Sequence, residues 1–109
     1  MPARSLLRIV ASAALVPLLA GAAPARPRDV AVVIENMTYT PASLALRPGD
    51  RVTWTNRDLV PHTTTARDGR FDSKAIAAGA SYTWVASGKG PLAYACAYHP
   101  AMVARLVLP

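Results

Sequence analysis

Cysteine is almost absent from this chain: its 109 residues include one cysteine, and histidine occurs only twice. A single thiol cannot build an intramolecular disulfide framework, and a chain this short cannot form two domains or a large enzyme with an elaborate cleft. Acidic residues are also scarce, with 6 Asp and Glu against 12 Lys and Arg. Because the basic residues are scattered and not interleaved with aromatics, we do not expect nucleic acid as a partner.

Long apolar runs are confined to the start of the sequence. Two arginines precede an uncharged apolar stretch over residues 9–20, and Ala20-Gly21-Ala22 offers the small residues that a signal peptidase requires. This pattern predicts an export signal over residues 1–22, with cleavage after residue 22 or as late as residue 25. The stretch is shorter than the roughly 20 residues that span a bilayer, so a retained membrane anchor is the weaker alternative and we expect no stable membrane insertion after cleavage. The signal has no adjacent arginine pair, which favours the general secretory route into the periplasm.

The predicted export limits the roles that the single cysteine can have. In an oxidising compartment Cys96 could form an intermolecular disulfide, act as a reactive thiol, or bind a metal as a thiolate. It could also be a buried cysteine that serves as a small apolar residue. The residues around Cys96 distinguish among these hypotheses.

Strand periodicity dominates residues 28–109. Apolar and β-branched residues occur in short runs, many of them alternating with polar residues, and turn-forming pairs such as Pro-Gly and Asp-Gly lie between the runs. The expected strands cover residues 30–34, 44–47, 51–56, 62–65, 81–85, 92–96 and 103–108. Residues 73–78 are compatible with one helical turn. Short strands with frequent turns predict an all-β fold, a sandwich or barrel of about seven or eight strands.

The alternation also predicts which side chains face the core. Val52 and Trp54 share one face of their strand, and Tyr94 and Cys96 share one face of theirs. We expect these four side chains to pack together inside the fold, with Cys96 at the end of its strand.

The neighbours of Cys96 form a Cys-x-x-His-x-x-Met sequence that ends at Met102, in a loop between two expected strands. The second histidine, His62, begins an earlier strand. One thiolate, two imidazoles and a thioether are the donors of a blue-copper site, a trigonal His₂Cys set with a weak axial Met. Zinc prefers four full ligands, and the chain has no third histidine or second cysteine to supply them. His62 or Met102 alone is more typical of a core or surface residue, but the joint set predicts a copper site at His62, Cys96, His99 and Met102.

With these residues in view, the sequence resembles the cupredoxin family, and most closely its amicyanin, pseudoazurin and plastocyanin-type members. The matching stretches are residues 39–44, 48–56, 61–62, 79–82 and 94–102. The two-residue spacers of the last stretch, and Pro100 after His99, are similar to the short amicyanin loop. The resemblance implies a Greek-key β-sandwich over residues 28–109 that holds one type 1 copper ion, cycling between Cu(I) and Cu(II). It also implies that His62, Cys96, His99 and Met102 are the ligands.

One residue departs from the family pattern. Amicyanin-like proteins usually carry Asn after the first histidine, where it helps to fix the cysteine loop, and this chain carries Thr63. We expect the threonine hydroxyl to replace that hydrogen bond.

The resemblance implies a small exported carrier of one electron between periplasmic redox partners, such as a dehydrogenase, a c-type cytochrome or an oxidase, and not an enzyme. We expect a monomer that contacts these partners through an apolar patch around His99. The residues expected to border this patch are Met37, Leu59, Val60, Pro61, Pro100 and Ala101. A periplasmic copper-binding or trafficking protein is the alternative. A copper enzyme would need further histidines for a second metal centre, and both histidines already belong to the first.

Overall fold

The computed structural model describes residues 3, 11–13 and 26–109. The predicted export signal over residues 1–22 lies almost entirely outside these described residues and stays a prediction. Within the described ranges, no helix is long and apolar enough to cross a membrane.

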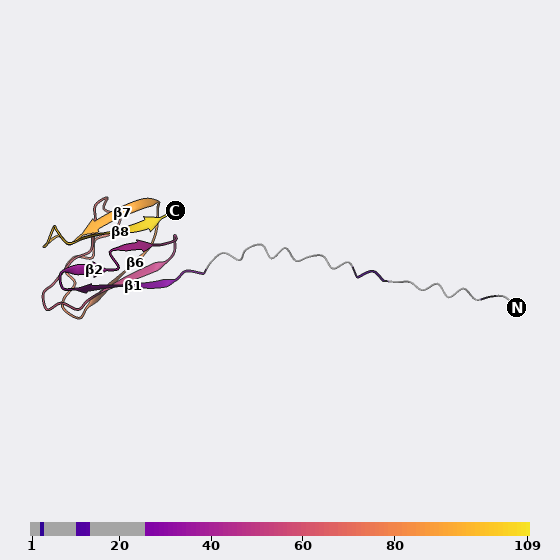
Figure 1. The fold of residues 1–109 in the computed structure, drawn as a ribbon, viewed down its shortest axis with the longest axis horizontal. Helices are drawn as coiled ribbons and strands as arrows, with labels where there is room; N and C mark the ends of the chain where they lie inside the picture. Colours follow the sequence, from indigo (N-terminus) through magenta and orange to yellow (C-terminus); the bar gives the residue numbers. More distant parts are fainter. Residues whose placement is uncertain (1–2, 4–10, 14–25) are drawn as a thin grey trace.

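Among the described residues, eight strands form two four-stranded sheets. The strands of the first sheet are, in spatial order, β2 (Thr38–Thr40), β1 (Asp29–Glu35), β4 (Arg51–Asn56) and β6 (Ser81–Val85). Those of the second are β3 (Ser43–Ala45), β8 (Val103–Leu108), β7 (Gly90–Ala95) and β5 (Thr65–Ala66). Figure 1 shows the two layers, with β7 and β8 in one and β1, β2 and β6 in the other.

The order of the strands shows how the chain is wound. The hairpins β1–β2 and β7–β8 each stay within one sheet, and every other connection between successive strands crosses to the opposite sheet. As a result β1 pairs with β4, and β3 with β8, in parallel. The all-β Greek-key sandwich predicted from the sequence is confirmed.

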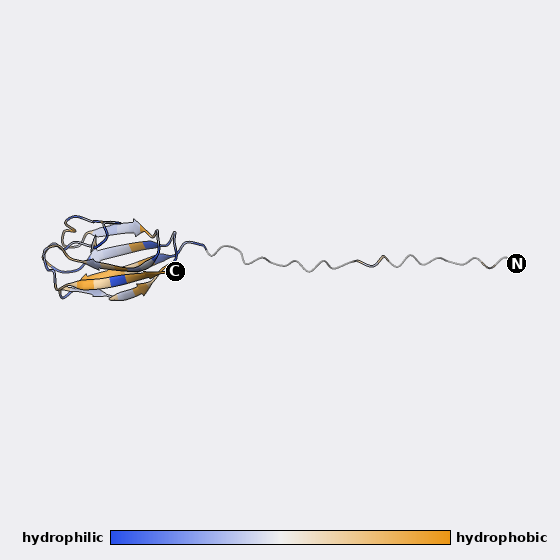
Figure 2. Cartoon of the chain, turned by 90° about the horizontal axis from the view of Figure 1, so that it is seen from above, coloured by the Kyte–Doolittle hydropathy of each residue, from blue (hydrophilic) through white to orange (hydrophobic). Residues whose placement is uncertain are grey.

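Alternation along the strands builds the core between the sheets. Val52 and Trp54 of β4 have no exposed surface and lie opposite Trp84 and Tyr82 of β6. From the second sheet, the Tyr94 hydroxyl accepts a hydrogen bond of 3.1 Å from the Trp54 indole nitrogen. Orange hydrophobic residues lie mostly on the strands in Figure 2, while many loops are blue. The predicted inward positions of Val52, Trp54 and Tyr94 are therefore confirmed.

Two parts of the strand prediction are wrong. The segment predicted as a strand over residues 62–65 is mostly a loop, and β5 begins only at Thr65. Before that point the backbone of His62 pairs with Ile76 instead of with the sheet. Strand β2 was not expected at all, because three residues are too few to show an alternating pattern.

The expectation of a possible helical turn over residues 73–78 is also wrong. Lys74 has a positive φ of 57°, and its N–H donates to the Asp72 carboxylate at 2.9 Å. This side-chain bond stabilises a turn in place of a helix. The segment then runs alongside residues 62–65 as a strap, with Ile76 opposite His62 and Asp72 opposite Thr65.

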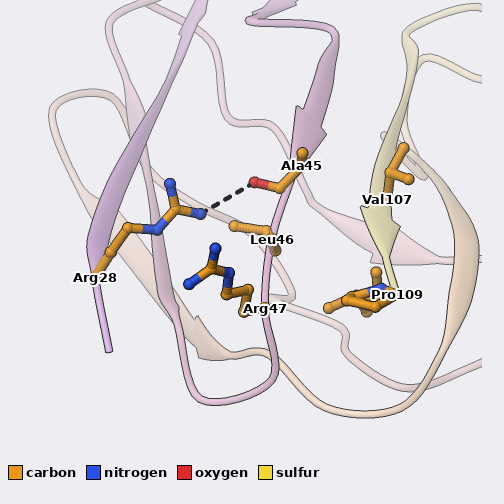
Figure 3. A pocket seen from close by; sticks show the side chains of 7 residues that line it. Arg28, Ala45, Leu46, Arg47, Val107 and Pro109 are labelled. Carbon is orange, nitrogen blue, oxygen red and sulfur yellow. Dashed lines mark hydrogen bonds between the residues drawn. The ribbon is translucent and has the colours of Figure 1, made fainter. Parts of the chain in front are cut away.

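A buried carboxylate holds the end of the sandwich where β1 and β4 begin. Asp50 is 2% exposed and accepts hydrogen bonds from the Arg28 backbone N–H at 2.9 Å, the Arg28 guanidinium at 2.8 Å and the Arg47 backbone N–H at 2.9 Å. Figure 3 shows the Arg28 guanidinium also reaching the Ala45 carbonyl oxygen, across a hollow lined by Arg47. One carboxylate thus joins the start of β1 to the loop that precedes β4.

The Asp50 network predicts a dependence of stability on acid pH. The Arg28 side chain, followed by the backbone N–H groups of Arg47 and Arg28, lowers the pKa of Asp50 well below its usual 3.8. The carboxylate therefore stabilises the fold fully above about pH 4, and this contribution is lost as the pH falls towards the lowered pKa. We expect Asp50→Asn to reduce the free energy of unfolding at pH 7 by about 1.5–3 kcal/mol, the range for a hydrogen bond to a charged group.

Urea denaturation at pH 7, 4 and 3 measures both effects. The wild-type protein should lose more stability between pH 4 and pH 3 than the Asp50→Asn variant does. Asp29→Asn is the matched control, because it removes an exposed carboxylate that pairs with Arg51 near the same end. Equal pH dependence in the wild type and Asp50→Asn would mean that Asp50 does not anchor the fold.

Candidate metal centre

Three donor side chains meet at the end of the sandwich opposite Asp50. His62 precedes β5, Cys96 directly follows β7, and His99 lies in the loop between β7 and β8. Their donor atoms all lie within 4.8 Å of one another. The Cys96 sulfur is 3.8 Å from Nδ1 of His62 and 3.7 Å from Nδ1 of His99. His62 and Cys96 are buried and His99 is half-buried, so the cluster reaches the surface at His99.

Backbone hydrogen bonds close the loop that carries two of these residues. The Cys96 N–H donates to the Met102 carbonyl at 3.0 Å, and the Met102 N–H donates to the His99 carbonyl at 2.8 Å. The His99 N–H in turn donates to the Cys96 carbonyl at 3.3 Å. Met102 is buried at the end of this loop. The short spacers of the sequence thus become two tight turns, which set the direction of each side chain.

Asp58 fixes the orientation of His62. Its carboxylate lies 2.8 Å from Nε2 of His62, and it is largely buried. An ionised carboxylate only accepts, so Nε2 carries the proton and Nδ1 keeps a free lone pair directed at the Cys96 sulfur. A carboxylate that holds the outer nitrogen of a metal-binding histidine is a common arrangement in metal sites.

A tight turn between β1 and β2 holds the Asp58 carboxylate in place. The two residues of this turn, Asn36 and Met37, have positive φ values of 53° and 61°, and both direct their backbone N–H at the Asp58 carboxylate, at 2.7 and 3.0 Å. The Met37 N–H is the largest cause that lowers the pKa of Asp58, against a smaller opposing effect of burial. The carboxylate therefore remains charged while it holds His62.

Buried Asn56 shapes the loop that contains Asp58. Its side-chain amide donates to the carbonyls of Val60 and Ile76, both at 2.9 Å, and its side-chain oxygen accepts from the Asp58 N–H at 3.0 Å. Sequence reasoning missed the roles of both Asn56 and Asp58. The only local signal was an aspartate four residues before the first histidine, a spacing that has no meaning until the loop geometry is known.

Thr63 joins the first histidine to the cysteine loop. Its hydroxyl oxygen accepts a hydrogen bond of 2.7 Å from the Ala97 N–H, and its own backbone N–H points at the Cys96 sulfur at 3.3 Å. The Thr63 hydroxyl therefore makes a hydrogen bond to the cysteine loop, as expected from the sequence.

The surroundings of Cys96 favour the charged form of its sulfur. Burial alone would raise the pKa of the thiol. Hydrogen bonds to the sulfur, foremost the one from the Thr63 N–H, outweigh that effect and lower the pKa to about 6. At neutral pH the thiolate therefore predominates, and the thiolate is the form that binds a metal.

The two sulfur–nitrogen distances in the cluster fit a trigonal metal. Metal–nitrogen bonds of about 2.0 Å and a metal–sulfur bond of about 2.3 Å at trigonal angles place nitrogen and sulfur about 3.7 Å apart. The two Nδ1–Sγ distances in this structure agree with that value. A mixed set of one thiolate and two imidazoles suits copper in both oxidation states. The cluster thus fits one type 1 copper ion.

Solved structures of copper proteins resemble this chain. An oxidised amicyanin variant with leucine in place of a methionine is 26% identical, with a TM-score of 0.69, over 73% of this chain and 81% of the amicyanin. A purple cupredoxin from Nitrosopumilus maritimus is 28% identical, with a TM-score of 0.66, over 74% of this chain and 100% of its own. No protein-family model matches this chain, and no curated protein does. The two-sheet fold is thus that of the cupredoxins, and the His-Cys-His cluster fits the one copper ion of a cupredoxin-like site.

Proposed function

We propose that this protein is an exported type 1 copper protein that carries single electrons between periplasmic redox partners. The observation that carries the proposal is the arrangement of His62, Cys96 and His99, whose donor atoms all lie within 4.8 Å of one another. Bound copper would supply the Cu(I)/Cu(II) couple. The protein would hold the same donor geometry in both oxidation states, so that little rearrangement accompanies electron transfer.

We propose His62, Cys96 and His99 as the strong ligands, with Met102 as the weak axial ligand. The free Nδ1 of His62 and the thiolate of Cys96 support this assignment. Met102 supports it through its burial and its backbone bonds to Cys96 and His99. Asp58 keeps His62 in the required tautomer.

Electrons would enter and leave through the surface around His99. Three apolar side chains near this end are exposed: Leu59 by 96%, Val60 by 45% and Met37 by 41%. Pro61, Pro100 and Ala101 are exposed as well. A small apolar surface of this kind suits weak, short-lived contacts with a dehydrogenase, a c-type cytochrome or an oxidase. We expect the carrier to be a monomer.

A periplasmic copper-trafficking protein is the alternative. Transfer of the metal itself would favour exposed donors that a partner can reach, whereas His62 and Cys96 are buried. Their burial favours slow exchange of copper and rapid exchange of electrons. Copper that passes to an acceptor protein faster than electrons do would support trafficking instead.

Addition of Cu(II) to the protein tests the proposal directly. We expect an intense visible absorption from thiolate-to-copper charge transfer, the EPR spectrum of a type 1 site, and a reversible one-electron potential. Cys96→Ser should abolish the absorption, because an alcohol cannot replace the thiolate. A band that survives this substitution would show that Cys96 is not the ligand, and a protein that stays colourless with Cu(II) would refute the function.

Replacement of the axial ligand should change the potential but not the occupancy. The Met102 thioether donates weakly to the ion, so Met102→Leu should retain copper and raise the reduction potential. Cyclic voltammetry measures the change. Met37→Leu is the matched control, since Met37 is exposed and lies in the β1–β2 turn. A potential that stays at the wild-type value would exclude an axial role for Met102.

Removal of the Asp58 carboxylate should weaken copper binding. Without it the outer nitrogen of His62 loses its fixed acceptor, and loss of such a partner typically costs about 10–100-fold in metal affinity. Competition with a chelator should show this loss for Asp58→Ala and not for Asp29→Ala, which removes an exposed carboxylate far from the site. Equal affinities in the two variants would contradict the orienting role of Asp58.

A further inference from the structure

A chain of side-chain hydroxyls leads from the cysteine loop towards the protein surface. It starts at the Ala97 N–H, which donates to the Thr63 hydroxyl oxygen at 2.7 Å. Thr63 is 3% exposed, so its own hydroxyl proton needs an acceptor inside the protein. The Thr65 hydroxyl oxygen lies 2.9 Å away and can accept it.

The next group fixes the direction of this chain. The Thr65 hydroxyl lies 3.4 Å from the Asp72 carboxylate, the longest contact of the series. An ionised carboxylate can only accept, so Thr65 points its proton at Asp72 and leaves its oxygen free for the proton of Thr63. All donors then point one way, from Ala97 through Thr63 and Thr65 to Asp72, an order in which each bond polarises and strengthens the next.

Lys74 holds the Asp72 carboxylate, the last group in this series of hydrogen bonds. The Lys74 backbone N–H donates to one Asp72 oxygen at 2.9 Å, and the Lys74 ammonium lies 3.1 Å from the other. At the residue after Asp72, the Ser73 N–H donates to the Thr64 carbonyl at 3.0 Å and the Thr64 N–H donates to the Ser73 hydroxyl at 2.8 Å. The strap that contains Asp72 is thereby fixed against residues 64 and 65.

We propose that Thr65 and Asp72 are positioning residues for the copper loop and act through Thr63. Ala97 directly follows Cys96, so the strength of the bond on its N–H sets how firmly the thiolate is held. The bond to the Ala97 N–H is expected from a single asparagine side chain in related proteins. In this protein the Thr63 hydroxyl makes it, supported by the Thr65 hydroxyl and the Asp72 carboxylate. The consequence for copper rests on the proposed function, whereas the consequence for the loop does not.

The test compares Thr65→Val with a conservative variant of the same residue and with a control variant on the other sheet. Valine keeps the shape of threonine and removes the hydroxyl, and Thr65→Ser keeps the hydroxyl. Thr83→Val is the matched control, since it breaks another threonine hydroxyl pair, the 2.7 Å contact between Thr53 and Thr83 on the far sheet. Hydrogen exchange at the Ala97 amide is followed by NMR in the Cu(I)-loaded protein and in the metal-free protein.

We expect Thr65→Val to speed exchange of the Ala97 amide by roughly 2- to 10-fold, the effect of about one hydrogen bond, while the amides of β4 keep their rates. Thr65→Ser and Thr83→Val should keep the wild-type rate. Asp72→Ala should accelerate exchange in the same direction as Thr65→Val, and Asp72→Asn less, because the amide oxygen can still accept. A rate in Thr65→Val equal to that in Thr83→Val, in either metal state, overturns the proposal.

The copper readout separates this proposal from the proposed function. In the loaded protein, Thr65→Val should release Cu(I) to a chelator faster by a similar factor, and Thr65→Ser should restore the wild-type rate. Accelerated amide exchange in a protein that never binds copper would uphold the relay and refute the function. Accelerated amide exchange with unchanged copper release would overturn the link between the relay and the metal.

Discussion

The contact between Thr63 and the cysteine loop is the constraint on which the metal centre depends. It joins Thr63 to Cys96 and Ala97, residues 33 and 34 positions later in the sequence, through one bond to the sulfur and one to the next backbone N–H. Because Thr63 directly follows His62, the same contact sets the distance between the first imidazole and the thiolate. The sandwich supplies the two rigid supports, since Cys96 extends β7 and β5, which begins just after Thr63, pairs with that strand. The spacing of the donor side chains is thus a property of strand pairing.

Charge and backbone conformation complete the site from the opposite side. Asp58 brings one negative charge next to His62, and two N–H groups from a turn with positive φ values keep it there. Positive φ at two residues other than glycine costs conformational free energy, and such strain is often found at functional sites. Here it directs both N–H groups at one carboxylate. The outer nitrogen of His62 is satisfied in this way, which leaves the Nδ1 lone pair free.

Much of the fold follows from the sequence because burial on one face of a strand imposes a period of two. The predicted bounds of β4, β6 and β8 agree with the structure at both ends. Short elements without a period were missed or misread, as with β2 and the strap around Lys74. Their conformation depends on side-chain bonds to the backbone, which periodicity does not report.

The donor residues were predictable for a different reason: the chain contains so few histidines and cysteines that a joint site leaves little choice. Asp58 and Asn56 could not be found in that way. Aspartate and asparagine are common loop residues, and their function arises only when the β1–β2 turn and residue 76 come close to the loop that follows β4. Such contacts between distant segments cannot be predicted from sequence patterns alone. The candidate donors are visible in the sequence, whereas Asp58 and Asn56, which orient His62, are not.

The central claim is that the protein frame arranges the donors before the metal arrives. Crystal structures of the metal-free, Cu(I) and Cu(II) forms at neutral pH test it most directly. The account predicts that Nδ1 of His62, the sulfur of Cys96 and Nδ1 of His99 keep their positions within about 0.5 Å across the three forms, the tolerance expected of a preorganised site. A metal-free form in which the loop from Cys96 to Met102 adopts another conformation, and closes only when copper binds, would contradict it.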